Sequence, residues 1–384
     1  MSNFQSQALP STFRAIVCHD YGQPPKLETL PMPEAMPGSA IVKILAAPCG
    51  ATQKNTLLRP RNPFFSNPTP FIPGVSAVGR VAAVGPDASS LKIGQLVLLE
   101  PFVRGRDDPD AQILKGLFGG PSPAAQKLSQ EHLWRNGNWA EYARVPLENC
   151  YALDEKVLLG KPEEGNLGYD IAELPYLAKQ LVAYGGFRSI DLQAGETVIV
   201  TPATGSFSGA AVEVASAMGA RVIAVGRNVN TLQRLAENIP RVHPVQLTGD
   251  IEKDVALLTQ FGPVDAFMDF TPNSLTTPVH LKACMSALRH YGRGVLMGFP
   301  HGDLSVNYGQ MVLKSLTLKA QYMYDREDVK GMIKLAERGL LKLGKKAGVQ
   351  ILGQYKLEDW EKALEHAAEN GGWEQEVVFR PFDE

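Results

Sequence analysis

Cysteine is scarce in this sequence of 384 residues, and no long hydrophobic run is present. The cysteines, Cys18, Cys49, Cys150 and Cys284, are far apart and form no C-x-x-C pair, which argues against a disulfide framework. No apolar stretch approaches the roughly 20 residues of a membrane-spanning helix, and the polar start does not look like a secretory signal. We therefore expect a reduced, cytoplasmic protein with no membrane partner.

An excess of charge of one sign is also missing. The chain has 38 Lys and Arg against 40 Asp and Glu, a formal net charge of −2. Such a balance, without a basic tract, argues against a nucleic-acid partner. With 44% hydrophobic residues, the chain is long enough to bury a large core and to form two domains.

Residues 197–226 have the pattern of a dinucleotide-binding unit. An apolar strand, Thr197–Thr201, leads into a turn of small residues and then into an amphipathic helix; a second apolar strand, Arg221–Gly226, follows. In such a unit the turn lets the backbone approach a pyrophosphate, and the helix presents free N–H groups and the positive end of its dipole. The pattern predicts a bound dinucleotide.

The turn departs from the G-x-G-x-x-G fingerprint, because Ala203 and Ser208 stand where outer glycines are usual. A turn of small residues also forms where only tight packing is needed, so that alternative stays open. The candidate cofactor-binding residues of the turn are Ala203, Thr204, Gly205, Ser206, Phe207 and Ser208.

The end of the second strand bears on the choice of dinucleotide. An NAD enzyme places Asp or Glu there to accept hydrogen bonds from the ribose 2′-hydroxyl, but this chain has Gly226, Arg227 and Asn228. A carboxylate would repel a 2′-phosphate, whereas an arginine fork can bind it. We therefore expect NADPH as the cofactor. The alternative is that Arg227 is an exposed cation without a ligand.

The wider pattern predicts an α/β protein of two parts. Short strands separated by Pro and Gly fill residues 13–94, which predicts a small β domain. Strands and helices alternate from residue 168 to 317, which predicts a doubly wound parallel sheet. Its later elements are expected at 241–247, 264–270, 294–299 and 316–322, with a helix at 274–289.

At this point the chain resembles the medium-chain dehydrogenase/reductase superfamily, which contains zinc alcohol dehydrogenases and zinc-free quinone and enoyl reductases. The resemblance covers nearly the whole chain. It implies a GroES-like catalytic domain at 1–167 and 318–384, a Rossmann NADP(H)-binding domain at 168–317, and a substrate cleft between them. The motifs that carry it are 73–79 (PGVSAVG), 80–85 (RVAAVG), 94–97 (GQLV), 137–142 (GNWAEY), 183–185 (AYG) and 357–364 (LEDWEKAL).

The resemblance allows zinc to be tested by position. Catalytic zinc needs three protein ligands, and in zinc members these are a Cys, the His of a Gly-His-Glu motif, and a further Cys or Asp. Cys49 falls at the first position, but Val75 and Ser76 follow Gly74 at the second, and the third falls near Ala178. Residues 101–138 also lack the four cysteines of a structural zinc lobe. We expect no metal.

Without a Lewis acid, an alkoxide is hard to stabilise, and zinc-free relatives mostly pass a hydride from NADPH to an activated C=C bond. The candidate proton donors are Cys49 and Thr52, in the loop that carries catalytic groups in relatives, and Lys54, just beyond that loop. Each has an alternative role, as a buried hydrophobe, a turn cap or a solvated cation. Val182 stands where relatives often carry a Thr near the nicotinamide.

Two further features are assigned by position. Phe270 with Thr271 and Gly298 with Phe299 follow strands whose carboxyl ends bind ligands in open α/β sheets, so they are candidate cofactor contacts. Residues 104–137 form a long stretch in place of the zinc lobe; we expect a pocket wall, an oligomer contact, or a surface excursion without a role.

By analogy with relatives, edge strands near 295–299 and 316–319 predict a homodimer.

Three functions stay open at this stage. The first is an NADPH-dependent, zinc-independent reductase of an enone, enoyl or quinone, a small-molecule substrate. The second is a carbonyl reductase or alcohol dehydrogenase. The third is an NADPH-binding protein without turnover. The site chemistry favours the first, because a fold alone does not fix a function.

Overall fold

The computed structural model describes residues 9–130, 132–276, 278–300 and 302–383, and the contacts divide the chain into two compact units. Unit 1 takes the described residues up to 178 together with 350–371 and those from 375 onward; unit 2 takes 179–349 and 372–374. The limits therefore lie near 178 and 349, where the sequence pattern had placed them at 167 and 317.

Unit 2 contains a six-stranded parallel sheet in the order β12-β11-β10-β13-β14-β15. This is the strand order of a Rossmann domain. All five residues of β10 are buried, as expected of a parallel strand covered on both faces. The strands are β10 (Thr197–Thr201), β11 (Arg221–Gly226), β12 (Val242–Gln246), β13 (Val264–Asp269), β14 (Leu288–Leu296) and β15 (Thr317–Ala320).

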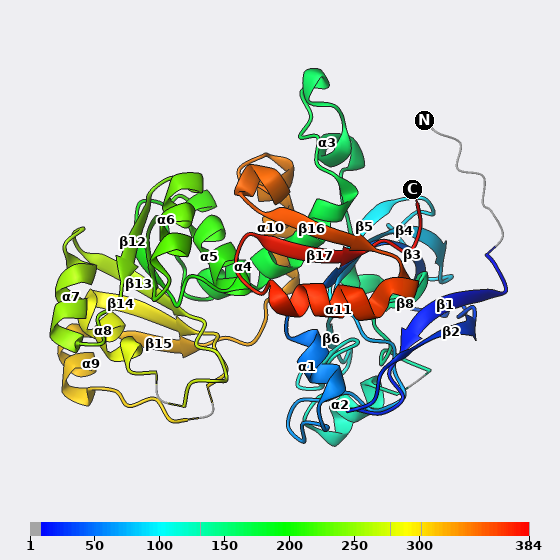
Figure 1. The fold of residues 1–384 in the computed structure, drawn as a ribbon, viewed down its shortest axis with the longest axis horizontal. Coiled ribbons are helices and arrows are strands. Elements are labelled where there is room, and N and C mark those ends of the chain that lie inside the picture. The colour runs from blue at the N-terminus through cyan, green and yellow to red at the C-terminus, as the bar shows by residue number, and fades with distance from the viewer. Residues whose placement is uncertain (1–8, 131, 277, 301, 384) are drawn as a thin grey trace. The chain divides into compact units, whose positions relative to one another are not determined.

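Helices connect these strands and cover the sheet (Figure 1). Helix α5 ends where Gly219 adopts φ +93°, a left-handed conformation that glycine adopts without strain. The amphipathic helix α6 is capped by Asn228, whose side-chain oxygen accepts a hydrogen bond from the Thr231 N–H at 3.2 Å. The helices are α4 (Leu177–Ser189), α5 (Ser206–Ala217), α6 (Val229–Asn238), α7 (Ile251–Thr259), α8 (His280–Ala287), α9 (Tyr308–Lys314) and α10 (Arg326–Glu337).

Unit 1 is a β domain built around the long strand β3, which pairs antiparallel with β4, β8 and β17. Its fold is GroES-like. Its strands are β1 (Thr12–Val17), β2 (Lys26–Pro31), β3 (Ser39–Cys49), β4 (Ala77–Val84), β5 (Leu96–Leu99), β6 (Phe102–Arg104), β7 (Gln112–Leu114), β8 (Tyr142–Pro146), β9 (Cys150–Ala152), β16 (Gln350–Tyr355) and β17 (Gln375–Phe379). Its helices are α1 (Gln53–Leu58), α2 (Pro123–Leu128), α3 (Glu155–Leu159) and α11 (Trp360–Glu369).

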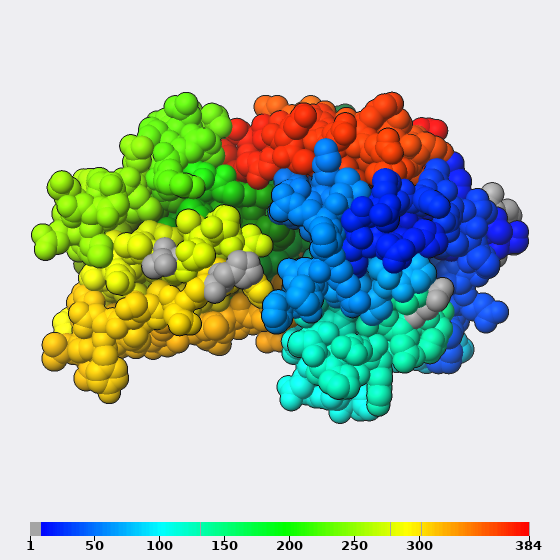
Figure 2. Space-filling view, turned by 60° about the horizontal axis from the view of Figure 1, so that its bottom comes forward, coloured from blue at the N-terminus to red at the C-terminus, as the bar shows by residue number. Residues whose placement is uncertain are grey.

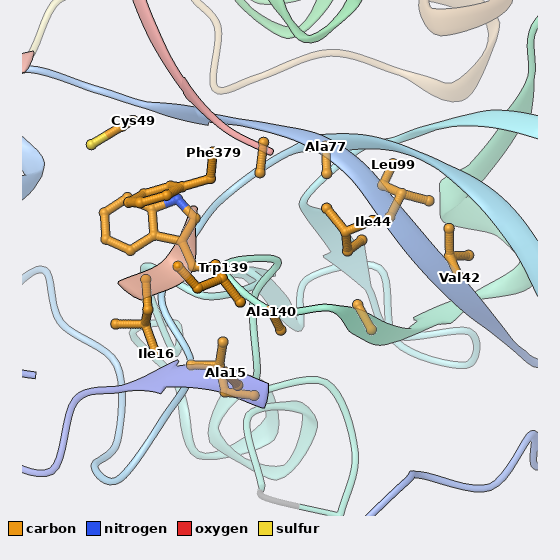
Figure 3. Packing of buried hydrophobic residues seen from close by; sticks show 14 of the residues in the cluster. Ala15, Ile16, Val42, Ile44, Cys49, Ala77, Leu99, Trp139, Ala140 and Phe379 are labelled. Carbon is orange, nitrogen blue, oxygen red and sulfur yellow. The ribbon is translucent and has the colours of Figure 1, made fainter. Parts of the chain in front are cut away.

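The core of unit 1 packs around Trp139, whose ring meets that of Phe379 edge-on with centroids 4.9 Å apart. Figure 3 shows Cys49 beside this aromatic pair and Ile16 below it. The Trp139 indole N–H also donates to the Pro48 carbonyl at 3.1 Å. The core therefore fixes the end of β3, where the catalytic loop of the predicted site begins.

Three predicted elements differ from those observed. Residues 13–94 were expected to hold strands only, yet α1 lies there. The helix expected at 274–289 is confined to α8, because a non-helical segment precedes it. Strand β14 pairs on both sides, so residues 295–299 supply no free edge, whereas β15 does lie at the sheet edge. Within the described residues, no helix is long and apolar enough to cross a membrane.

Candidate functional site

The first part of the site is the turn between β10 and α5. Gly205 occupies the N-cap position of α5, and its N–H donates to the Ser208 hydroxyl at 3.0 Å. The first N–H groups of a helix lack helical acceptors, and the dipole makes this end favourable for an anion. Ser206 begins the helix, and the Phe207 ring after it is 46% exposed. The turn therefore places free helix N–H groups where they could bind an anion.

The structure brings this turn to the end of β11. The Ala203 N–H donates to the Val225 carbonyl at 2.6 Å. A Cβ placed on Gly226 would lie only 3.1 Å from the Thr204 methyl group. A larger residue at 226 would thus press on the turn, which explains why glycine suits this position.

Arg227 follows β11 directly and is exposed. Its carbonyl accepts a hydrogen bond from the Gln246 side chain at 3.3 Å, and it makes no ion pair with a described carboxylate. The next residue, Asn228, is held at the start of α6 by its capping bond. The guanidinium is therefore available for an anion at the strand end.

The ends of β13 and β14 also come together. The Phe299 N–H donates to the Thr271 carbonyl at 2.9 Å, and the Phe270 N–H donates to the Thr201 carbonyl at 2.8 Å. A Cβ on Gly298 would lie 2.5 Å from the Thr271 nitrogen, so only glycine permits this approach. The candidate residues after β13 and β14 therefore lie together at the carboxyl-terminal edge of the sheet: Phe270, Thr271, Gly298 and Phe299.

A polar cluster at this edge was missed in the sequence. The Thr271 hydroxyl donates to the Asp269 carboxyl at 2.5 Å and lies 3.2 Å from the His280 ring nitrogen Nε2. Asp269 ends β13, Thr271 follows it by two residues, and His280 begins α8, so the approach of His280 has no signal in residue spacing.

The short segment 372–374 was missed as well, although it lies against the turn. Gly372 forms a β-bridge with Gly205, and the Trp373 N–H donates to the Thr204 carbonyl at 3.3 Å. The buried Trp373 indole donates to the Glu213 carboxyl at 2.7 Å. A segment from the end of the chain therefore braces the turn of unit 2.

In unit 1 the three candidate proton donors differ in their surroundings. Cys49 is 3% exposed, and its thiol lies 3.6 Å from the Ala363 carbonyl in α11. Lys54 forms an ion pair with Glu365 at 3.6 Å. Thr52 is exposed at the N-cap position of α1 and makes no side-chain capping bond.

The residues at the zinc positions do not fit that metal. Val75 has no ligand atom in its side chain, Ser76 is a buried hydroxyl, and Ala178 has no donor, so Cys49 is the single thiol of the set. In the part of the chain that the structure describes, no group of three His, Cys, Asp or Glu side chains could hold a metal ion. We derive no step through zinc.

A buried lysine lies behind the Gly74 loop. The Lys115 side chain is 2% exposed, with its Nζ 3.3 Å from the Asn138 side-chain oxygen, and Asn138 donates to the Val75 carbonyl at 3.0 Å. Burial lowers the pKa of Lys115 to about 7; the Cys150 thiol opposes this shift and the Arg144 charge adds to it. The signal for it in the sequence is a single Lys within the apolar run 113–118.

Two family models match the chain. The alcohol dehydrogenase GroES-like domain matches residues 36–155, and the zinc-binding dehydrogenase model matches residues 208–338. The first match lies in unit 1 and the second in unit 2, so both parts of the molecule agree with one superfamily.

Individual relatives are distant but span most of the chain. An alcohol dehydrogenase of Rhizobium meliloti (strain 1021) is 26% identical over 85% of this chain and 89% of its own length. An L-threonine 3-dehydrogenase of Vibrio parahaemolyticus is 24% identical, with 78% and 79% covered. A short chain alcohol dehydrogenase (rspB) of E. coli CFT073, solved in complex with NADH, has a TM-score of 0.72 at 18% identity, covering 97% and 100%. At 18% identity, the similarity to this solved structure shows a shared fold and no more.

Proposed function

Because the chain belongs to the medium-chain dehydrogenase/reductase superfamily, whose members are nicotinamide-dependent oxidoreductases, we propose that it is an NADPH-dependent, zinc-independent reductase of an activated C=C bond. The substrate class is an enone, enoyl compound or quinone. The main support for NADPH over NADH is the exposed Arg227 at the end of β11, a position with no Asp or Glu.

Different residues of unit 2 would bind different groups of the dinucleotide. The α5 N-terminus at Gly205 offers N–H groups to the pyrophosphate, and Arg227 offers a fork to a 2′-phosphate. Gly226 and Gly298 leave room for backbone approach, and Asn228 fixes the start of α6 beside the arginine. When bound, the cofactor supplies the hydride.

The residues of unit 1 favour reduction of a conjugated double bond. Hydride addition to the carbon β to a carbonyl produces an enolate, which hydrogen bonds can stabilise without a metal. Simple alcohol oxidation instead benefits from a Lewis acid, and the donor set at Cys49, Val75, Ser76 and Ala178 does not hold zinc.

Among the three candidate donors, we assign the proton-donor role to Thr52. Cys49 is packed in the core and Lys54 is paired with Glu365, whereas the Thr52 hydroxyl is exposed. Thr52→Val should therefore lower kcat by about 10²-fold, a typical loss for one acid–base group. Thr56→Val, a change of the same type within α1, should leave kcat near the wild-type value in the same steady-state assay. Equal kcat values for the two variants would remove Thr52 from this role.

An alcohol dehydrogenase or carbonyl reductase is the second candidate. It is favoured by the relatives named alcohol dehydrogenase and L-threonine 3-dehydrogenase. This alternative predicts reduction of isolated ketones or aldehydes.

A paired panel of substrates separates the two candidates. Each α,β-unsaturated carbonyl is supplied beside its saturated counterpart, and NADPH absorbance is followed with metal-free protein. We expect NADPH loss with the unsaturated member only. Equal rates with the saturated member would favour the carbonyl reductase, and loss with NADH alone would contradict the role of Arg227.

A further inference from the structure

Unit 1 contains a pocket of about 590 Å³ that has no part in the proposed reaction. Its walls come from the loop that contains Arg61 and Ser66 and from the segment between residues 119 and 135. The second segment belongs to the stretch 104–137, for which the sequence left a pocket wall, an oligomer contact and a surface excursion open. This stretch, cyan to green in Figure 2, contributes to the exposed face seen there.

The pocket is cationic. Arg61, Lys127 and Arg135 line it together with His132, and none of its described lining residues is acidic. Arg61 and Lys127 make no ion pair with a described carboxylate. Two exposed cations without a described carboxylate partner, Arg61 and Lys127, therefore line the same cavity as Arg135.

Hydrogen bonds hold the two walls together. The Gly119 N–H donates to the Ser66 carbonyl at 3.0 Å, and the Asn67 side chain donates to the Arg135 carbonyl at 2.9 Å. The Arg61 Nε donates to the Ser66 hydroxyl at 2.9 Å, which orients that guanidinium. Arg135 is 8% exposed, so its position is set by packing rather than by solvent.

We propose that this pocket binds a small molecule through a phosphate or pyrophosphate group. The Arg61 guanidinium supplies a fork that matches phosphate oxygens, and the Lys127 ammonium adds a point charge. Two cations without a described carboxylate partner exceed what one carboxylate would neutralise, which favours a ligand with more than one negative charge. Grouped cations also repel one another, and such an anion relieves this repulsion.

The test is titration calorimetry of the full chain with inorganic pyrophosphate, in excess NADPH so that the turn before α5 is already occupied. The double variant Arg61→Gln/Lys127→Gln removes two exposed cations of the pocket. The control Lys26→Gln/Lys92→Gln removes two exposed cations of unit 1 that do not line it, so the net charge is matched. We expect the first variant to weaken pyrophosphate binding by about tenfold or more, and the control to bind as the wild type does.

Equal affinity in wild type and Arg61→Gln/Lys127→Gln would overturn the proposal, as would an equal loss in the charge-matched control. Malonate tests the ligand class, and tighter binding of malonate than of pyrophosphate would overturn the phosphate assignment. Binding of a nucleoside diphosphate with the same variant dependence would identify an organic phosphate as the source; binding of pyrophosphate alone would identify a free one. NADPH affinity should be unchanged in the pocket variant, so the result does not depend on the cofactor proposal.

Discussion

The indole of Trp373 should stabilise unit 2 and the phosphate turn through one buried hydrogen bond. The Nε1 group donates to Glu213 at 2.7 Å, and Trp373 and Glu213 are 1% and 5% exposed. A second carboxyl oxygen of Glu213 accepts from the Gln180 side chain at 2.8 Å. Trp373→Phe removes the donor and keeps an aromatic ring over Gly209.

The expected cost follows from these contacts. Loss of a hydrogen bond to a buried carboxylate costs about 1–3 kcal/mol. The smaller ring leaves a cavity, which adds about 1 kcal/mol by the usual cost of lost buried volume. We therefore expect the free energy of unfolding to fall by about 2–4 kcal/mol. Trp373→Ala would remove far more packing and would hide the hydrogen-bond contribution.

The assay is urea unfolding followed by circular dichroism, with hydrogen exchange of residues 203–212 as the local readout. The control is Trp360→Phe, because Trp360 is half-buried in α11 of unit 1. It should cost less than about 1 kcal/mol, as expected for a smaller loss of packing. Exchange at 203–212 should rise in Trp373→Phe only. Equal stability losses in the two variants, with unchanged exchange at the turn, would refute the bracing role.

Three other changes test separate parts of the account. Arg227→Gln should raise KM for NADPH by about 10–100-fold, since each hydrogen bond to a charged group contributes about 1.5–3 kcal/mol; KM for NADH, measured in the same assay, should stay constant. Lys115 has a folded-state pKa of about 7, below its ordinary value, so the unfolded chain binds more protons above pH 7 and wild-type stability should rise by about 1.4 kcal/mol per pH unit from 7 toward 9. Lys115→Met should lack this rise and should be more stable than the wild type at pH 7. Urea midpoints that change by the same amount between pH 7 and 9 in the two proteins would contradict this prediction. Gly74→Ala should lower the free energy of unfolding by several kcal/mol, because its Cβ would lie 2.4 Å from the Trp139 ring at φ +101°. Gly165→Ala, at φ +82° with open space around it, should cost only about 1–2 kcal/mol of backbone strain. Similar decreases in melting temperature for the two variants would show that crowding at Gly74 is unimportant.

Local patterns predicted the nucleotide-binding unit well. Strands β10 and β11 have the predicted limits, because each is a short apolar run bounded by small or polar residues. The approach of Thr204 to Gly226 is a consequence of this unit, since a parallel βαβ unit brings these ends together.

The remaining parts depend on contacts between distant residues. Gly372 and Trp373 contact Gly205 and Thr204 of the turn from more than 160 positions away along the chain, and the Trp373–Glu213 bond spans 160 residues. The cluster of Asp269, Thr271 and His280 and the cationic pocket likewise join separate elements. No periodicity or motif encodes such tertiary juxtapositions, so sequence patterns could not predict them.

The position of the transferred hydride tests the central proposal most directly. An unsaturated carbonyl is reduced by metal-free protein with NADPH that carries deuterium at C4 of the nicotinamide, and the product is analysed by NMR. The proposal predicts deuterium on the carbon β to an intact carbonyl group. Deuterium on a carbinol carbon, with the double bond retained, would contradict it and identify a carbonyl reductase.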